Sequence, residues 1–161
     1  MSVNQTEKQT CYDDGFYIQA LEKYGDVGMW LLPTLVGGYG FISGNKMIPI
    51  SITLAGLIQK LAVEHLKKLF PKARPRPFRY GIISKEDQES FPSSHTAGAF
   101  LSVGLSIGIH GVSSVFTITT LILASLVGLS RILSQKHWTL DVTSGAAIGT
   151  LSGFAATKLF A

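Results

Sequence analysis

The sequence predicts an all-α protein, a polytopic transmembrane helical bundle with about five spans and an N-terminal interfacial helix. Three observations lead to this fold class. Charged residues make up 15% of the 161 residues, where about 25% is typical of globular domains, and hydrophobic residues make up 46%. No Asp, Glu, Lys or Arg occurs between Ser90 and Ser130. Apolar stretches of roughly 20 residues, the length that crosses a bilayer, recur along the chain. A chain of this length predicts one domain, residues 1–161.

The helical elements follow from these stretches in order. Residues 1–26 form a tail in which 14–25 place apolar side chains partly on one helical face, as in a helix that lies at a membrane surface. A plain solvated helix is the alternative for that segment. The uncharged run is too long for one crossing, and His110-Gly111 offers a break near its middle. The predicted spans are residues 27–43, 47–66, 96–109, 112–129 and 138–160.

Five crossings place the unusual polar residues on one side of the membrane. The polar loop 67–91, the start of the third span at 92–95 and the turn 131–137 all fall on that side. The connection 44–46, the break at His110-Gly111 and the C-terminus fall on the other. A soluble bundle of very apolar helices is the alternative, but uncharged helices of this length are uncommon outside membranes.

The net charge of +4 comes largely from one short segment. A local anion site explains this cluster more simply than nucleic acid does, so we expect no nucleic-acid partner. No set of Cys, His and acidic residues has the spacing of metal ligands, so we expect neither a metal nor another cofactor. Six basic residues make up the cluster: Lys67, Lys68, Lys72, Arg74, Arg76 and Arg79.

His137 and Asp141 are the first candidates for chemistry. On a helix a spacing of four puts them on one face, where the carboxylate can accept a hydrogen bond from one ring nitrogen. The other nitrogen then points outward as an oriented nucleophile or base. The alternative is that Asp141 merely caps the last helix, near the positive end of its dipole.

Two further motifs fall on the same side of the membrane. In KKLFPKARP, Lys67 and Arg74 could clamp one phosphate or attract anionic headgroups without specificity. In FPSSHT, Ser93 and Ser94 bring hydroxyls and backbone N–H groups to a helix start, with His95 beside them as an acid. A simple N-cap followed by an interfacial histidine is the alternative for this stretch.

Together the motifs read K-x6-RP, PS-x-H and SR-x5-H-x3-D, in that order. On these residues the chain resembles the type 2 phosphatidic acid phosphatase superfamily, which includes membrane lipid phosphatases, bacterial acid phosphatases and vanadium haloperoxidases. The resemblance covers residues 67–141. The family's membrane enzymes usually have six crossings, whereas this sequence predicts five.

The resemblance implies a role for each matching residue. Lys67, Arg74 and Arg131 are similar to the family's phosphate ligands, and Ser93 with the amide of Ser94 to its phosphate cradle. His95 matches the general acid that protonates the leaving alkoxide. His137 matches the histidine that attacks phosphorus, and Asp141 the carboxylate that orients it.

The expected function is therefore metal-independent hydrolysis of a lipid phosphate through a phosphohistidine intermediate. Lipid A 1-phosphate, undecaprenyl diphosphate, phosphatidylglycerophosphate and phosphatidic acid are the candidate substrates. A phosphotransferase with the same site, or a non-catalytic protein that binds anionic lipid, are the alternatives. The resemblance implies a bacterial inner-membrane protein with its site on the outer, periplasmic face, and the distribution of basic residues in the short loops favours the same orientation.

Overall fold

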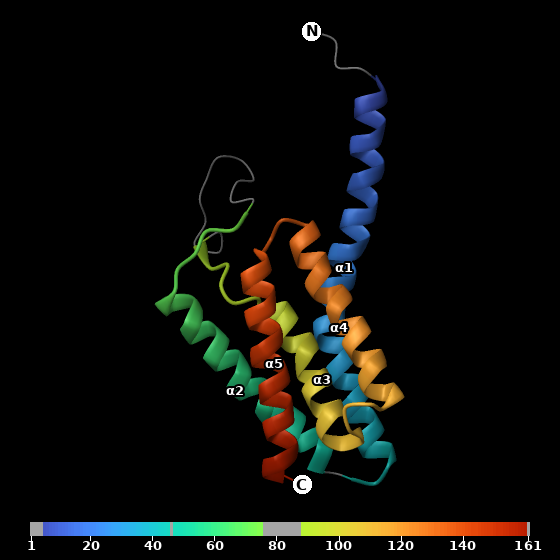
Figure 1. Ribbon diagram of the computed structural model, residues 1–161, viewed down its shortest axis with the longest axis vertical. Helices are drawn as coiled ribbons and strands as arrows, with labels where there is room; N and C mark the ends of the chain where they lie inside the picture. Colours follow the sequence, from blue (N-terminus) through green and yellow to red (C-terminus); the bar gives the residue numbers. More distant parts are fainter. Residues whose placement is uncertain (1–4, 46, 76–87, 161) are drawn as a thin grey trace.

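A computed structural model describes residues 5–45, 47–75 and 88–160, with side chains described from residue 16 to residue 159 of these ranges. Five helices follow one another along the chain (Figure 1). They are α1 (Gln5–Ile42), α2 (Met47–Leu69), α3 (Ser94–His110), α4 (Val115–Leu133) and α5 (Thr139–Phe160). The all-α helical bundle predicted from the sequence is confirmed.

The first helix differs from the prediction in its extent. Residues 14–25, predicted as a separate interfacial helix, and the span 27–43 belong to the single helix α1, whose N-terminal part projects beyond the rest of the bundle (Figure 1). Only Asp26 separates the two segments, and Pro33 comes later in the helix, so nothing at the junction forces the helix to end. Gly25 instead permits close packing, because a Cβ atom there would lie 2.3 Å from the Ser130 hydroxyl of α4.

Small residues let α5 lie directly against α3. A Cβ atom at Gly149 would lie 2.2 Å from the Ala97 carbonyl oxygen, and one at Gly153 equally close to that of Leu101. Glycines one turn apart on α5 thus form a smooth strip on which the α3 backbone rests, as is common where helices pack in lipid. This contact brings the first turns of the two helices together.

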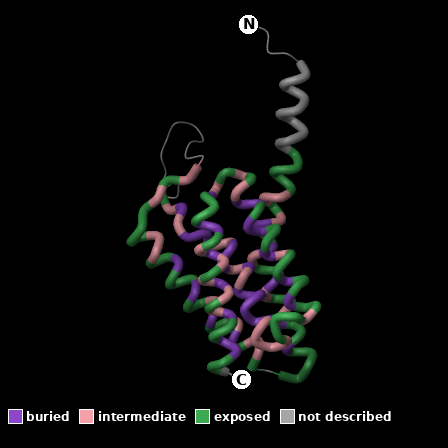
Figure 2. The backbone as a smooth tube through the Cα atoms, viewed as in Figure 1, coloured by how far each residue is buried: buried purple, intermediate pink, exposed green. Residues whose placement is uncertain are grey.

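The outer surface of the bundle is apolar. Exposed residues run along the outside of the helices (Figure 2), and on α2 and α4 many of them are large and hydrophobic. Among the described residues, the helices Met47–Leu69 and Val115–Leu133 are long and apolar enough to cross a membrane. A soluble bundle would turn such side chains inward, so this surface favours the membrane alternative. The exposed side chains include Leu54, Leu57, Ile58, Leu61, Leu121, Ile122, Leu126 and Leu129.

The polar connections gather at one end of the bundle. The segment after α2, the start of α3 and the turn between α4 and α5 lie at the end from which α1 projects (Figure 1). The C-terminus and the turn after α1 lie at the opposite end. The convergence that the crossing count predicts is therefore seen.

Candidate active site

Hydrogen bonds to backbone carbonyls hold the polar loop together and tie it to the start of α5. The amide of Lys72 donates to the Gln88 carbonyl at 2.8 Å, and the amide of Ser90 donates to the Lys72 carbonyl at 2.9 Å. The indole N–H of Trp138 donates to the Ala73 carbonyl at 2.8 Å. These bonds bring motifs that are some 65 residues apart in sequence into one place.

His137 is held by a backbone carbonyl. Its Nδ1 lies 2.7 Å from the carbonyl oxygen of Ser90. Because a carbonyl only accepts, Nδ1 carries the hydrogen and Nε2 keeps its lone pair. Burial is the main cause that lowers the pKa of His137, to about 3, and the charges of Arg74 and Lys67 act in the same direction. The imidazole is therefore neutral at neutral pH, as a nucleophile must be.

Asp141 does not hold His137 directly, which corrects the predicted contact between them. Its Oδ2 lies 3.9 Å from His137 Nδ1, too far for a hydrogen bond. The carboxylate instead accepts from the Ser90 hydroxyl at 2.5 Å and from Lys72 Nζ at 2.7 Å. The spacing argument fails because α5 begins at Thr139, so His137 lies before the helix and the pair does not share a helical face.

The capping alternative for Asp141 is also present in the structure. Its Oδ2 accepts from the backbone amide of Trp138 at 3.0 Å, the contact that an acidic residue in the first turn makes with the residue preceding the helix. Asp141 thus caps α5 and, through Ser90, supports the carbonyl that holds His137. Ser90 and Lys72 are members of this network that sequence spacing did not single out.

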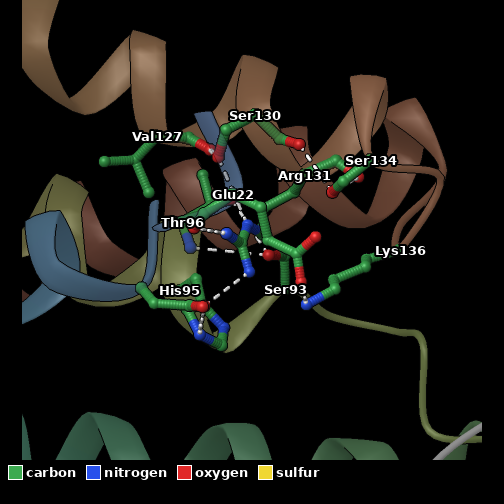
Figure 3. A network of polar contacts seen from close by, with 10 residues as sticks. Glu22, Ser93, His95, Thr96, Val127, Ser130, Arg131, Ser134 and Lys136 are labelled. Atoms are coloured by element: carbon green, nitrogen blue, oxygen red, sulfur yellow. Dashed lines mark hydrogen bonds and ion pairs between the residues drawn. The ribbon is translucent and has the colours of Figure 1, made fainter. Parts of the chain in front are cut away.

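Arg131 and His95 meet at a second network, which involves α1 (Figure 3). Oδ1 of Asp26 accepts from Arg131 Nη1 at 2.9 Å and lies 3.0 Å from His95 Nε2. Arg131 also donates through Nη2 to the Glu22 carbonyl at 2.6 Å, and Glu22 pairs with Lys136. Sequence reasoning missed Asp26, whose one signal was an acidic residue beside the first span at the end where the motifs converge.

The two serines of the second motif occupy different positions. Ser93 is fully buried and caps α3, accepting from the Thr96 hydroxyl at 3.0 Å, while its own amide donates to the Asp141 carbonyl at 3.0 Å. Ser94 is the first residue of α3 and lines a cavity together with His95 and Lys67. The helix start that the cavity reaches therefore begins at Ser94, where a phosphate can meet the positive end of the dipole.

This cavity continues between α1 and α2, with α3 beneath it. Its volume is about 1100 Å³. It starts at Lys67, Ser94 and His95 and extends to Gly38 and Pro49 near the opposite end of the bundle. Lys67 and Pro49 are 18 positions apart on α2, which corresponds to about 27 Å of helix. One cavity thus joins the polar end to the depth of the apolar bundle.

The bundle has an apolar outer surface, and histidines and cations gather at one of its ends. These features are typical of an integral-membrane protein whose polar end suits an anion. The chain belongs to the PAP2 superfamily, whose family model matches residues 48–161. That range holds all three motifs and leaves the whole of α1 outside it.

Similar proteins were found both by sequence and by structure. A lipid A 1-phosphatase of Porphyromonas gingivalis is 42% identical over 65 residues, covering 40% of this chain and 15% of that protein. The bacitracin transport permease protein BcrC of Bacillus licheniformis is 32% identical over 111 residues, covering 67% of this chain and 53% of that protein. This chain thus spans about half or less of the length of these curated relatives.

Among solved structures, Aquifex aeolicus LpxE superposes with a TM-score of 0.69 at 26% identity, covering 89% of this chain and 86% of that one. A Bacillus subtilis PAP2 type phosphatidylglycerolphosphate phosphatase gives a TM-score of 0.67 at 20% identity, covering 89% of this chain and 76% of that one. The second likeness shows the shared fold.

Proposed function

We propose that this protein is a lipid phosphate phosphatase that works without a metal, through a phosphohistidine intermediate. The observation that carries the proposal is the state of His137: a neutral imidazole whose Nδ1 is bound to a carbonyl and whose Nε2 keeps its lone pair. Lys67 and Arg74 supply positive charge beside it. This combination suits attack on a phosphate ester whose oxygens are neutralised by cations.

The reaction has two steps. In the first, His137 Nε2 bonds to phosphorus while the bond from phosphorus to the lipid oxygen breaks, and His95 gives that oxygen a proton. In the second, water attacks the phosphohistidine, His95 takes a proton from the water, and inorganic phosphate leaves as His137 is regenerated. Lys67, Arg74 and Arg131 are the proposed phosphate ligands, with Ser93 and the amide of Ser94 as the cradle.

The cavity between α1 and α2 is the proposed position of the lipid chain. It begins at residues of the phosphate site and continues among apolar helices, so a headgroup at Lys67 would leave its chain in the cavity. The relatives' names point to lipid A 1-phosphate as one substrate, beside undecaprenyl diphosphate, phosphatidylglycerophosphate and phosphatidic acid.

Release of inorganic phosphate from purified protein tests this function, across those four lipids and in excess chelator. We expect release from at least one lipid and no loss of rate with chelator. Release from none, or activity that needs an added divalent ion, would contradict the proposal. Consumption of lipid without release of phosphate would instead indicate a phosphotransferase.

The same phosphate-release assay, applied to the variant Gly38→Phe, tests whether the lipid chain lies in this cavity. Gly38 lines the cavity far from the phosphate site, and a Cβ atom there would meet nothing within 4 Å, so the ring enters the cavity without disturbing the fold. We expect dipalmitoyl phosphatidic acid to lose about tenfold or more in kcat/KM, the effect of excluding about two methylene groups. Dioctanoyl phosphatidic acid and the variant Gly38→Ala are the controls and should change little. An equal loss of kcat/KM on both lipids would show that the lipid chain does not lie in this cavity.

The site is proposed to face the periplasm. With the proposed phosphate ligands Lys67, Arg74 and Arg131 set aside, the opposite face carries Lys46 and Lys158 with no acidic residue. Exposed Gln88 lies in the loop at the site. We expect Gln88→Cys, in a Cys11→Ser background, to react with an impermeant thiol reagent on intact cells. Protection until the membrane is opened would place the site in the cytoplasm.

A further inference from the structure

We propose that Asp26 of α1 is the positioning residue of the general acid, aligning His95 for the leaving oxygen and favouring its protonated form. This inference rests on the proposed function. Asp26 lies outside the residues that the family model matches, so none of the three motifs includes it. The family model therefore assigns it no role.

One hydrogen bond and one ion-pair contact to a single oxygen carry the inference. Asp26 Oδ1 accepts from Arg131 Nη1 at 2.9 Å and lies 3.0 Å from His95 Nε2. The first distance is that of a charge-assisted hydrogen bond, and the second lies within ion-pair range. One carboxylate oxygen thus fixes the imidazole relative to a proposed phosphate ligand, although the two residues come from different helices.

The neighbouring glycine makes this contact possible. A Cβ atom at Gly25 would lie 2.4 Å from Arg131 Nη2, so any larger residue would push the guanidinium away from α1. The buried Arg131 side chain reaches past Gly25 to the Glu22 carbonyl as well as to Asp26. Gly25 and Asp26 act as a unit that receives Arg131 and places a negative charge beside His95.

The charges around His95 explain why it needs a carboxylate. Burial and the charges of Arg131, Lys136 and Lys67 lower the pKa of His95 to about 4. Asp26 of α1 opposes them. Glu22, the other acidic group of this network, pairs with Lys136. Removing the Asp26 charge would therefore lower the pKa of His95 further and disfavour the acid form.

The bond to Asp26 also decides which proton is transferred. Protonated His95 carries hydrogens on both nitrogens. The Nε2 hydrogen stays on the imidazole and faces Asp26 Oδ1. The Nδ1 hydrogen goes to the alkoxide oxygen as its bond to phosphorus breaks and the bond from phosphorus to His137 forms. The carboxylate thus acts through His95 and touches no reacting atom.

The experiment compares two leaving groups in Asp26→Asn, which keeps an oxygen for Arg131 and removes the charge. The substrates are dodecyl phosphate, whose alkoxide needs a proton, and a nitrophenyl phosphate with a dodecyl chain, whose phenolate does not. We expect kcat/KM for the alkyl ester to fall about 30-fold, less than the roughly 10²- to 10⁴-fold that a general acid contributes because His95 itself remains, and that for the aryl ester to fall less than about threefold. His95→Ala should show the same pattern more strongly.

Two control variants separate the outcomes. Glu22→Gln removes the nearby charge that pairs with Lys136 and should affect both esters equally, and Asp26→Glu should restore part of the alkyl-ester rate. Equal loss on both esters in Asp26→Asn would show that Asp26 only fixes α1 to α4, and no loss would deny it any role. Wild-type protein that hydrolyses neither ester would instead count against the proposed function.

Discussion

His137→Ala is expected to abolish phosphate release from every lipid of the panel, with a loss of about 10⁴-fold or more. The imidazole is the proposed nucleophile, and no other side chain of the described site presents a neutral nitrogen fixed in this way. The variant should still insert and fold, because alanine removes one hydrogen bond to the Ser90 carbonyl and leaves the α5 cap on Asp141 in place. Initial rates in detergent and a thermal unfolding curve measure the two properties.

Trapping the intermediate makes this result specific. Wild-type protein quenched during turnover of a ³²P-labelled lipid should carry label on His137, and His137→Ala should carry none. His95→Ala is the matched control, because it loses the general acid and keeps the nucleophile; it should still be labelled by the nitrophenyl ester. Lipid hydrolysis by His137→Ala at a rate near wild type would exclude the phosphohistidine mechanism.

The low pKa of His137 also predicts how labelling of the protein depends on pH. Burial and the neighbouring cations lower the pKa of His137 to about 3, so its proton is lost well below neutral pH. As the pH falls from 7 to 5 the nucleophile should stay neutral, whereas an unperturbed histidine would become mostly charged. Labelling by the aryl ester, which needs no general acid, should therefore persist across this range.

The sequence predicted helices α2 to α5 and the residues that gather at one end, because both depend on local information, but it divided α1 into two helices. Span length sets the helices, and the spacing within each motif identifies His95, Arg131 and His137. The contacts between motifs were beyond its reach. The pairing of Arg131 with Asp26 joins residues 105 positions apart and depends on how α1 packs on α4. Nothing in the run of basic residues marked Lys72 as the one that binds Asp141.

The role of Asp141 shows how a small structural detail changes a correct spacing argument. Residues four apart share a face only when both are helical, and α5 begins two residues after His137. The carboxylate is fully buried and reaches the imidazole through the hydroxyl and carbonyl of Ser90. Because Asp141 supports His137 indirectly, its loss should slow the reaction less than the loss of His137 itself.

Asp141→Ala is expected to lower kcat by about 10²- to 10³-fold, an effect smaller than that of His137→Ala and still severe. It removes the acceptor for the Ser90 hydroxyl and the counter-charge of Lys72, so the loop that presents the Ser90 carbonyl loses its anchor. Asp141→Asn, which keeps an oxygen for Ser90 but loses the charge, should fall between Asp141→Ala and wild type.

A double-mutant cycle with Ser90→Ala tests the route through which Asp141 acts. Because the proposed route runs through the Ser90 hydroxyl, the double variant should be no slower than Asp141→Ala alone. Ser134→Ala, which removes a hydroxyl bonded to the Ser130 carbonyl at the end of α4, should change kcat by less than about twofold. Independent, multiplying losses at Ser90 and Asp141 would show that the carboxylate acts by another path. Near-normal turnover by Asp141→Ala would reduce Asp141 to the cap of α5.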